Sequence, residues 1–162
     1  MKSTKVAARY AKALLDLAIE NNKVDQVLGD MNYIVGANAE THDFELLLKS
    51  PIIGASNKNV IFNQLFDQFE SITKKFIELI TMNGREGLLV EIANSFGTQV
   101  KEFKGIVPVT ITTASAMSAE TRDKILSKVK GLIHGTIEVT EEVNPALIGG
   151  FIVKMDDKRI DA

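Results

Sequence analysis

The hydrophobic pattern of this chain changes at Gly105, and that change constrains its fold more than any other feature. Before Gly105, apolar residues recur every three or four positions, the spacing of helices that bury one side. After it, β-branched residues gather in short runs such as 106–113, which are typical of strands. The pattern predicts an α+β protein, with a helical domain over residues 1–104 and a small α/β domain with a short mixed sheet over 105–162.

Start and stop signals divide the first domain into six expected helices, which together predict a six-helix bundle. Ser3 or Thr4 can cap the first helix, and Pro51 prevents the third from continuing. Asn83-Gly84 marks the end of the fifth, because glycine readily takes the left-handed conformation that follows many helices. The expected helices cover about residues 4–22, 24–39, 44–49, 56–69, 72–82 and 87–103.

The second domain is expected to contain strands around a single helix. Strands are predicted over residues 106–113, 136–143 and 147–155, with a turn at Asp156-Asp157 and a possible fourth strand over 159–162. Ser118 is predicted to cap a helix that runs to about residue 130. Because proline cannot donate a backbone hydrogen bond, Pro108 indicates either an edge strand or a strand that is paired on one side only at that residue.

Composition and motifs argue against catalysis and against nucleic acid as a partner. There are 19 basic and 21 acidic residues, so the chain lacks the basic surplus that phosphate binding needs. Cysteine is absent, and the two histidines, His42 and His134, stand far apart without a partner motif. No phosphate-binding loop, zinc-protease motif or serine-hydrolase motif occurs. We therefore expect no catalytic site, metal or cofactor, and no segment that inserts into a membrane.

The first expected helix carries more apolar surface than one core contact needs. On a helical projection its apolar residues cover an arc of roughly 240°, against the ~100° that faces a single core. Two interpretations remain open at this point. The helix could lie at the centre of the bundle, or it could pack on the bundle with one face and bind a partner with the other. The arc comprises Val6, Ala7, Ala8, Tyr10, Ala11, Ala13, Leu14, Leu15, Leu17, Ala18 and Ile19.

Five stretches in order along the chain resemble the delta subunit of F-type ATP synthases, whose mitochondrial relative is the oligomycin-sensitivity-conferring protein. The first is Ala8-Arg-Tyr-Ala-Lys-Ala-Leu14, and the second is Phe44-Glu-Leu-Leu-Leu-Lys-Ser-Pro51 with Ile53 and Lys58 behind it. The third joins Phe76-Ile-Glu-Leu-Ile80 to Asn83-Gly-Arg85 and Leu88-Leu89. Thr113-Ala114 with Ser118 follows, and the last is Asn144-Pro-Ala-Leu-Ile-Gly-Gly-Phe151 with Ile160-Asp-Ala162.

The resemblance implies a non-catalytic stator subunit that links the catalytic head to the peripheral stalk and resists rotor torque during proton-driven ATP synthesis. In this family the helical domain holds the N-terminal helix of an alpha subunit between its first and fifth helices, and the C-terminal domain meets the b subunits. A peripheral location at the cytoplasmic face of the bacterial inner membrane follows. The residues expected to contact the alpha subunit are Val6, Tyr10, Ala13, Leu14, Leu17, Leu79, Met82 and Asn83, while Ala11, Leu15 and Ala18 would face the core.

The chain departs from the family at its C-terminal end. In the family, the segment that resembles Asp161-Ala162 continues into a serine, a turn and a final helical segment. The sequence stops at Ala162, which is expected of either a natural short form or a truncation. This departure bears on the predicted contact with the b subunits, because that contact belongs to the C-terminal domain.

Overall fold

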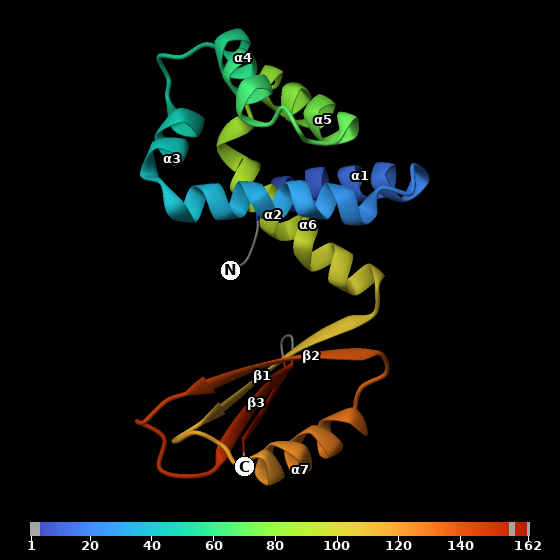
Figure 1. Ribbon diagram of the computed structural model, residues 1–162, viewed down its shortest axis with the longest axis vertical. Coiled ribbons are helices and arrows are strands. Elements are labelled where there is room, and N and C mark those ends of the chain that lie inside the picture. Colours follow the sequence, from blue (N-terminus) through green and yellow to red (C-terminus); the bar gives the residue numbers. More distant parts are fainter. Residues whose placement is uncertain (1–3, 156–157, 162) are drawn as a thin grey trace. The chain divides into compact units, whose positions relative to one another are not determined.

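The computed structural model describes residues 4–155 and 158–161, with side chains described up to Met155. The chain divides into two compact units, residues 1–100 and 101–162, which are described separately here. Helices make up the first unit, and a mixed sheet with one helix makes up the second (Figure 1). The predicted turn at Asp156-Asp157 and the predicted strand residue Ala162 lie outside the described residues.

The helices of the first unit lie close to the ranges expected from the sequence. The described elements are α1 (Lys5–Glu20), α2 (Val24–Glu40), α3 (His42–Lys49), α4 (Ala55–Leu65), α5 (Ser71–Met82), the short 3-10 turn η1 (Glu86–Leu88) and α6 (Leu89–Phe103). The fourth helix was expected to reach residue 69 but ends at Leu65. Beyond it, Phe66 turns inward and stacks on Phe69 with ring centroids 4.5 Å apart. The side chain of Asp30 accepts a hydrogen bond from the Glu70 amide at 2.9 Å, which fixes the start of α5.

Local hydrogen bonds close the ends of several helices. The hydroxyl of Thr4 accepts from the Ala7 amide at 3.1 Å at the start of α1, as the sequence predicts. At the end of α5, Gly84 has a φ of 72°. The amides of Gly84 and Arg85 donate to the carbonyls of Thr81 and Ile80 at 3.0 and 2.8 Å. These two bonds define a Schellman motif, so the stop predicted at Asn83-Gly84 is confirmed.

One apolar core unites the helices of the first unit. Alanines on α1 allow its neighbours to approach closely, since Ala7, Ala11 and Ala18 are fully buried. Larger side chains from the other helices fill the remaining space. The largest fully buried side chains of this core are Leu14, Val27, Met31, Ile34, Ile80, Leu89, Ile92, Phe96 and Val100.

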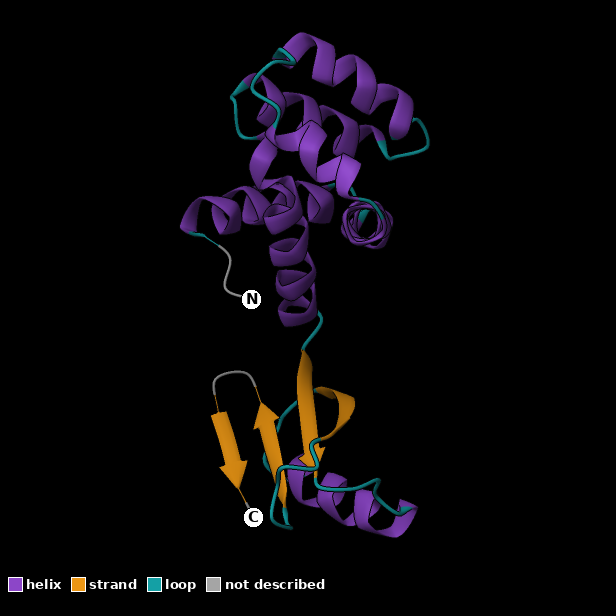
Figure 2. Cartoon of the chain, turned by 90° about the vertical axis from the view of Figure 1, so that its left-hand side faces the viewer, coloured by secondary structure: helices purple, strands orange, loops and turns teal. Residues whose placement is uncertain are grey.

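The second unit is a sheet with strand order β2-β1-β3-β4, one side of which is covered by α7 (Ala119–Lys130) (Figure 2). The strands are β1 (Ile106–Thr113), β2 (Thr136–Val143), β3 (Phe151–Met155) and β4 (Lys158–Asp161). β1 runs parallel to β2 and antiparallel to β3, while β3 and β4 are antiparallel, so the sheet is mixed. Its core joins Val109, Ile111 and Val153 of the sheet to Ile125 and Val129 of α7.

Two details of this sheet involve proline and glycine. Pro108 pairs with Glu138 of β2, and the described pairing of β1 with β3 runs from Val109 to Thr113. Because β1 is a central strand, the edge-strand alternative for Pro108 is excluded. The other alternative, pairing on one side only at Pro108, concerns the residue after Met155, which lies outside the described residues. The third strand was expected from residue 147 and starts at Phe151, because Gly149 and Gly150 have positive φ angles of 84° and 73° that lie outside strand geometry.

Candidate partner-binding surface on helices α1 and α5

Helix α1 has two apolar faces, and only one of them belongs to the core. Ala11, Leu15 and Ala18 are buried, as expected, and Ala7 is buried with them. Val6 and Tyr10 are half-buried, Ala13 is exposed, and Leu17 is 42% exposed. On a helical projection, Val6, Tyr10, Ala13 and Leu17 lie within about 60° of one another, on the side away from Ala11 and Leu15. The wide apolar arc therefore comprises a core face and a separate exposed face.

The sequence-based placement of Leu14 on the exposed face is wrong. Leu14 is only 1% exposed and is among the largest buried side chains of the core. It projects about 80° from Val6 but only about 20° from Ala7 and about 60° from Ala11, both of which are buried. Its position therefore follows its buried neighbours, and it cannot line a surface.

Helix α5 contributes a second group of exposed residues. Leu79 is 55% exposed, and Met82 and Asn83 are exposed with it. Ile77, Ile80 and Thr81 of the same helix are buried. α5 therefore also has two faces, and its exposed face ends at Asn83, where the Schellman motif stops the helix.

An aromatic contact between Tyr10 and Phe76 joins the two helices. The ring centroids are 6.3 Å apart and the rings meet edge to face at 72°. Leu79 lies one helical turn after Phe76, and Leu17 lies two turns after Tyr10. We call Val6, Tyr10, Ala13, Leu17, Leu79, Met82 and Asn83 the α1–α5 surface. Phe76 was not predicted to belong with the contact residues, although its position three residues before Leu79 is the signal that could have placed it beside them.

Contacts with α6 hold α1 in place. The side-chain amide of Gln99 donates to the Ala8 carbonyl at 3.0 Å and to the Ser95 hydroxyl at 3.1 Å. The Thr4 amide donates to a carboxylate oxygen of Glu91 at 3.4 Å. The α1–α5 surface contains no acidic or basic side chain. Association there would therefore be driven by burial of apolar area.

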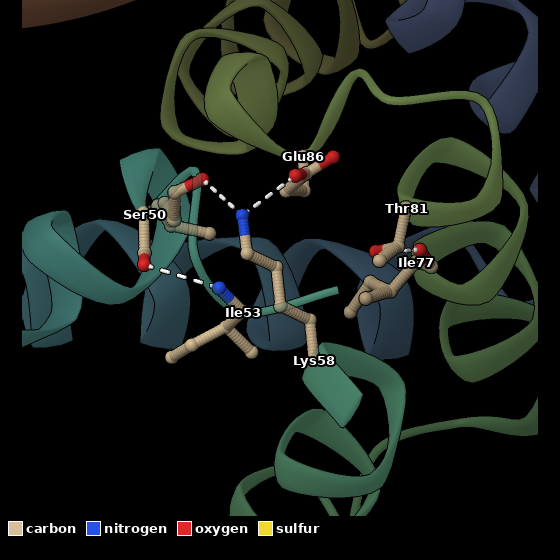
Figure 3. Close-up of polar contacts among 7 residues, drawn as sticks. Ser50, Ile53, Lys58, Ile77, Thr81 and Glu86 are labelled. Atoms are coloured by element: carbon tan, nitrogen blue, oxygen red, sulfur yellow. Dashed lines mark hydrogen bonds and ion pairs between the residues drawn. The ribbon is translucent and has the colours of Figure 1, made fainter. Parts of the chain in front are cut away.

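A buried ion pair lies just beyond the C-terminal end of α5, and the sequence did not predict it. Lys58 of α4 is 2% exposed, and its Nζ donates to Oε1 of Glu86 at 2.7 Å and to the Leu48 carbonyl at 3.1 Å (Figure 3). The pair ties α4 to η1, the turn that follows α5. No local pattern predicts it, because its partners stand 28 residues apart.

The histidines are dispersed over the surface. His42 is exposed and its Nδ1 lies 3.4 Å from a carboxylate oxygen of Glu45, while His134 is exposed in the second unit. Among residues 4–155 and 158–161, no group of three or more histidine and acidic side chains is arranged to hold a metal ion. In the same part of the chain, no helix combines the length and the apolar character needed to cross a membrane.

The family model for the ATP synthase delta (OSCP) subunit matches residues 6–162, nearly the whole chain. The chain belongs to the ATP synthase delta (OSCP) subunit family. ATP synthase subunit delta of Cytophaga hutchinsonii is 34% identical over 162 residues, covering 99% of this chain and 88% of the relative. The subunit of the same name from Carboxydothermus hydrogenoformans is 33% identical over 161 residues, covering 99% and 91%.

The fold of this delta-family subunit is also that of a much more distant relative. A chain of the Toxoplasma gondii mitochondrial ATP synthase hexamer superimposes with a TM-score of 0.72 at 21% identity, covering 93% of this chain and 84% of the other. Members of the family are structural subunits of ATP synthase. The delta-family subunit described here is accordingly a non-catalytic component of the stator.

Proposed function

We propose that the α1–α5 surface binds the N-terminal helix of the ATP synthase alpha subunit. The observation that carries this proposal is the exposed apolar face of α1, which the Tyr10–Phe76 contact places beside the exposed face of α5. An amphipathic helix that docks on such an apolar surface uses apolar side chains one turn apart as anchors. Full burial of each half-exposed leucine would contribute on the order of 1 kcal/mol.

The same proposal assigns a role to each domain. Residues 1–104 form a six-helix bundle that binds the alpha subunit, and residues 105–162 bind the b subunits of the peripheral stalk. The subunit then sits peripherally at the cytoplasmic face of the bacterial inner membrane, held there by its partners. Supporting this division, the helical unit alone carries the two apolar faces described above, and it has its own core.

Calorimetric titration with a peptide that contains the first ~20 residues of the cognate alpha subunit tests the proposal. We expect saturable one-to-one binding with a negative heat-capacity change, the signature of apolar burial. Leu79→Asp should weaken this binding by a factor of ten or more, since it places a charge on the apolar α1–α5 surface.

Leu46→Asp is the matched control, because Leu46 of α3 is 54% exposed, almost the same as Leu79, and lies outside the α1–α5 surface. This variant should bind like the unmodified subunit. The proposal fails if the folded subunit does not bind the peptide, or if the two variants lose the same affinity.

A further inference from the structure

A hollow in the helical unit shares no residue with the α1–α5 surface. It has a volume of about 570 Å³ and lies between α2 and the segment that joins α4 to α5. Gly29 on α2 opens one wall, because a Cβ built on it would meet no atom within 4 Å. The hollow, which we call the aromatic groove, is lined by Gly29, Asp30, Tyr33, Gln64, Leu65, Phe66, Asp67, Gln68 and Phe69.

Three rings give this groove a rigid aromatic wall. Tyr33 meets Phe66 and Phe69 edge to face, with centroids 6.3 and 5.7 Å away and interplanar angles of 89° and 86°. Phe66 and Phe69 stack on each other at 4.5 Å. Tyr33 contacts both rings and remains 59% exposed. The groove therefore offers an electron-rich ring surface to whatever enters it.

The charges that line the groove are negative. Asp30 and Asp67 are its ionisable carboxylates, and no lysine or arginine lines it. Asp30 is held in place by the Glu70 amide and by the Thr73 hydroxyl, which donate to its Oδ2 at 2.9 and 2.7 Å. Asp67 is exposed, and Nζ of Lys74 lies 4.0 Å from its Oδ1, at the outer limit of an ion pair. A better-placed cation could readily replace so long a contact.

From the rings and the carboxylates together, we infer that the aromatic groove binds an arginine side chain on a partner protein. A guanidinium group is planar and weakly hydrated, so it can stack on Tyr33 while it donates hydrogen bonds to a neighbouring carboxylate. An anionic or purely apolar segment would bring no cation to these carboxylates, of which only Asp67 has one, at the 4.0 Å of the Lys74 contact. This contact is additional to the alpha-subunit contact and does not depend on it.

The probe for this inference is N-acetyl-arginine amide, titrated into the full-length subunit and followed by amide chemical shifts. Concentrations up to about 50 mM are needed, since a single residue binds in the millimolar range at best. We expect saturable shifts at Gly29, Tyr33 and Asp67. N-acetyl-citrulline amide, which has a similar shape and no charge, should bind at least about fivefold more weakly.

Two variants and one control test whether the probe binds in the aromatic groove. Gly29→Leu fills the groove, and because leucine favours helix more than glycine does, this variant should be at least as stable as the unmodified subunit. Saturable shifts should disappear in Gly29→Leu and persist in Gly97→Leu, the matched change on α6, where a Cβ also meets nothing within 4 Å. Asp67→Asn should weaken binding about two- to fivefold.

The inference is overturned by any of three results. These are the absence of saturable shifts in the groove, equal binding of the arginine and citrulline probes, and unchanged binding by Gly29→Leu. None of them bears on the alpha-subunit peptide, whose titration reports on a different pair of helices. Failure of one proposal is therefore distinguishable from failure of the other.

Discussion

The ammonium group of Lys58 lies 2.7 Å from Oε1 of Glu86, and both side chains are largely withdrawn from water. The Leu48 carbonyl accepts a second hydrogen bond from the same ammonium group. The other carboxylate oxygen of Glu86 is buried, and no described residue donates a hydrogen bond to it. Lys58 is therefore the counterion of a largely buried carboxylate, and its loss should destabilise the helical unit.

Lys58→Met is predicted to destabilise the subunit by about 3–5 kcal/mol, because it leaves a buried carboxylate without a cation. Urea denaturation followed by circular dichroism measures the change. Lys58→Met combined with Glu86→Leu should recover most of the loss, since it removes both charges together. A single-variant loss below about 1 kcal/mol would contradict the dependence of Glu86 on Lys58.

Leu14→Ala and Leu17→Ala should separate the core face of α1 from its exposed face. Leu14 is buried, so its truncation should cost about 2–5 kcal/mol of stability through the cavity it leaves. Leu17→Ala should cost less than about 1 kcal/mol of stability but weaken alpha-peptide binding about fivefold. Urea denaturation and calorimetric titration give the two readouts. If Leu17→Ala had no effect on binding, Leu17 would not belong to the α1–α5 surface.

Gly135→Ala should disrupt the junction of β1 and β2. Gly135 has a φ of 122°, and a Cβ on it would stand 2.4 Å from the Gly105 carbonyl oxygen, which accepts the Thr136 amide hydrogen bond. We expect a loss of about 2 kcal/mol or more. Faster hydrogen exchange at Ile137 and Val139 would localise the damage.

Gly131→Ala is the matched control for that change. Gly131 has a helical φ of −69°, and its nearest atom to a new Cβ is the Lys128 carbonyl oxygen at an ordinary 3.5 Å. This substitution should be neutral or stabilising by up to about 1 kcal/mol. Equal damage from the two substitutions would show that the close approach at Gly105 is not the cause.

The pKa of Glu45 should be lower than that of an ordinary glutamate. Nζ of Lys49 lies 2.7 Å from its carboxylate and lowers the pKa through a hydrogen bond and through charge, and His42 adds smaller effects of the same sign. A lowered folded-state pKa means that the interaction stabilises the fold above the unfolded-state pKa. It is lost as the pH falls through the folded-state value.

Carbon-13 titration of the Glu45 carboxyl group measures this pKa directly. Lys49→Met should raise it toward the ordinary value, whereas His42→Gln should raise it less, because histidine contributes the smaller effects. A Glu45 pKa that does not respond to Lys49→Met would rule out the ion pair as its cause.

Features that depend on neighbouring residues could be predicted from the sequence. Thr4 and Ser118 cap their helices through hydrogen bonds to amides three residues ahead, and Gly84 ends α5 through its own backbone angle. Such signals are local, so composition and spacing reveal them. The α+β fold follows from the change of periodicity at Gly105 for the same reason.

Features that depend on distant residues could not be predicted. The early end of α4 comes with contacts of Phe66 with the distant rings of Tyr33 and Phe44, and with a hydrogen bond between Asp30 and the Glu70 amide, 40 residues along the chain. The projection of α1 gave its apolar arc but not the boundary between the core and the surface, and Leu14 lies near that boundary. The aromatic groove is likewise lined by residues of α2 and by residues at and after the end of α4. No sequence pattern relates these two segments.

The strand order β2-β1-β3-β4 has a consequence for folding during synthesis on the ribosome. The helical core is complete in sequence once Val100 has been made, so the first unit can begin to fold while translation continues. β1 is synthesised next, but the strands that pair with its two edges, β2 and β3, are synthesised later. In a nascent chain stalled between β1 and β3, we expect the helices of the first unit to resist protease. β1, which still lacks its partner β3, should remain accessible to chaperones.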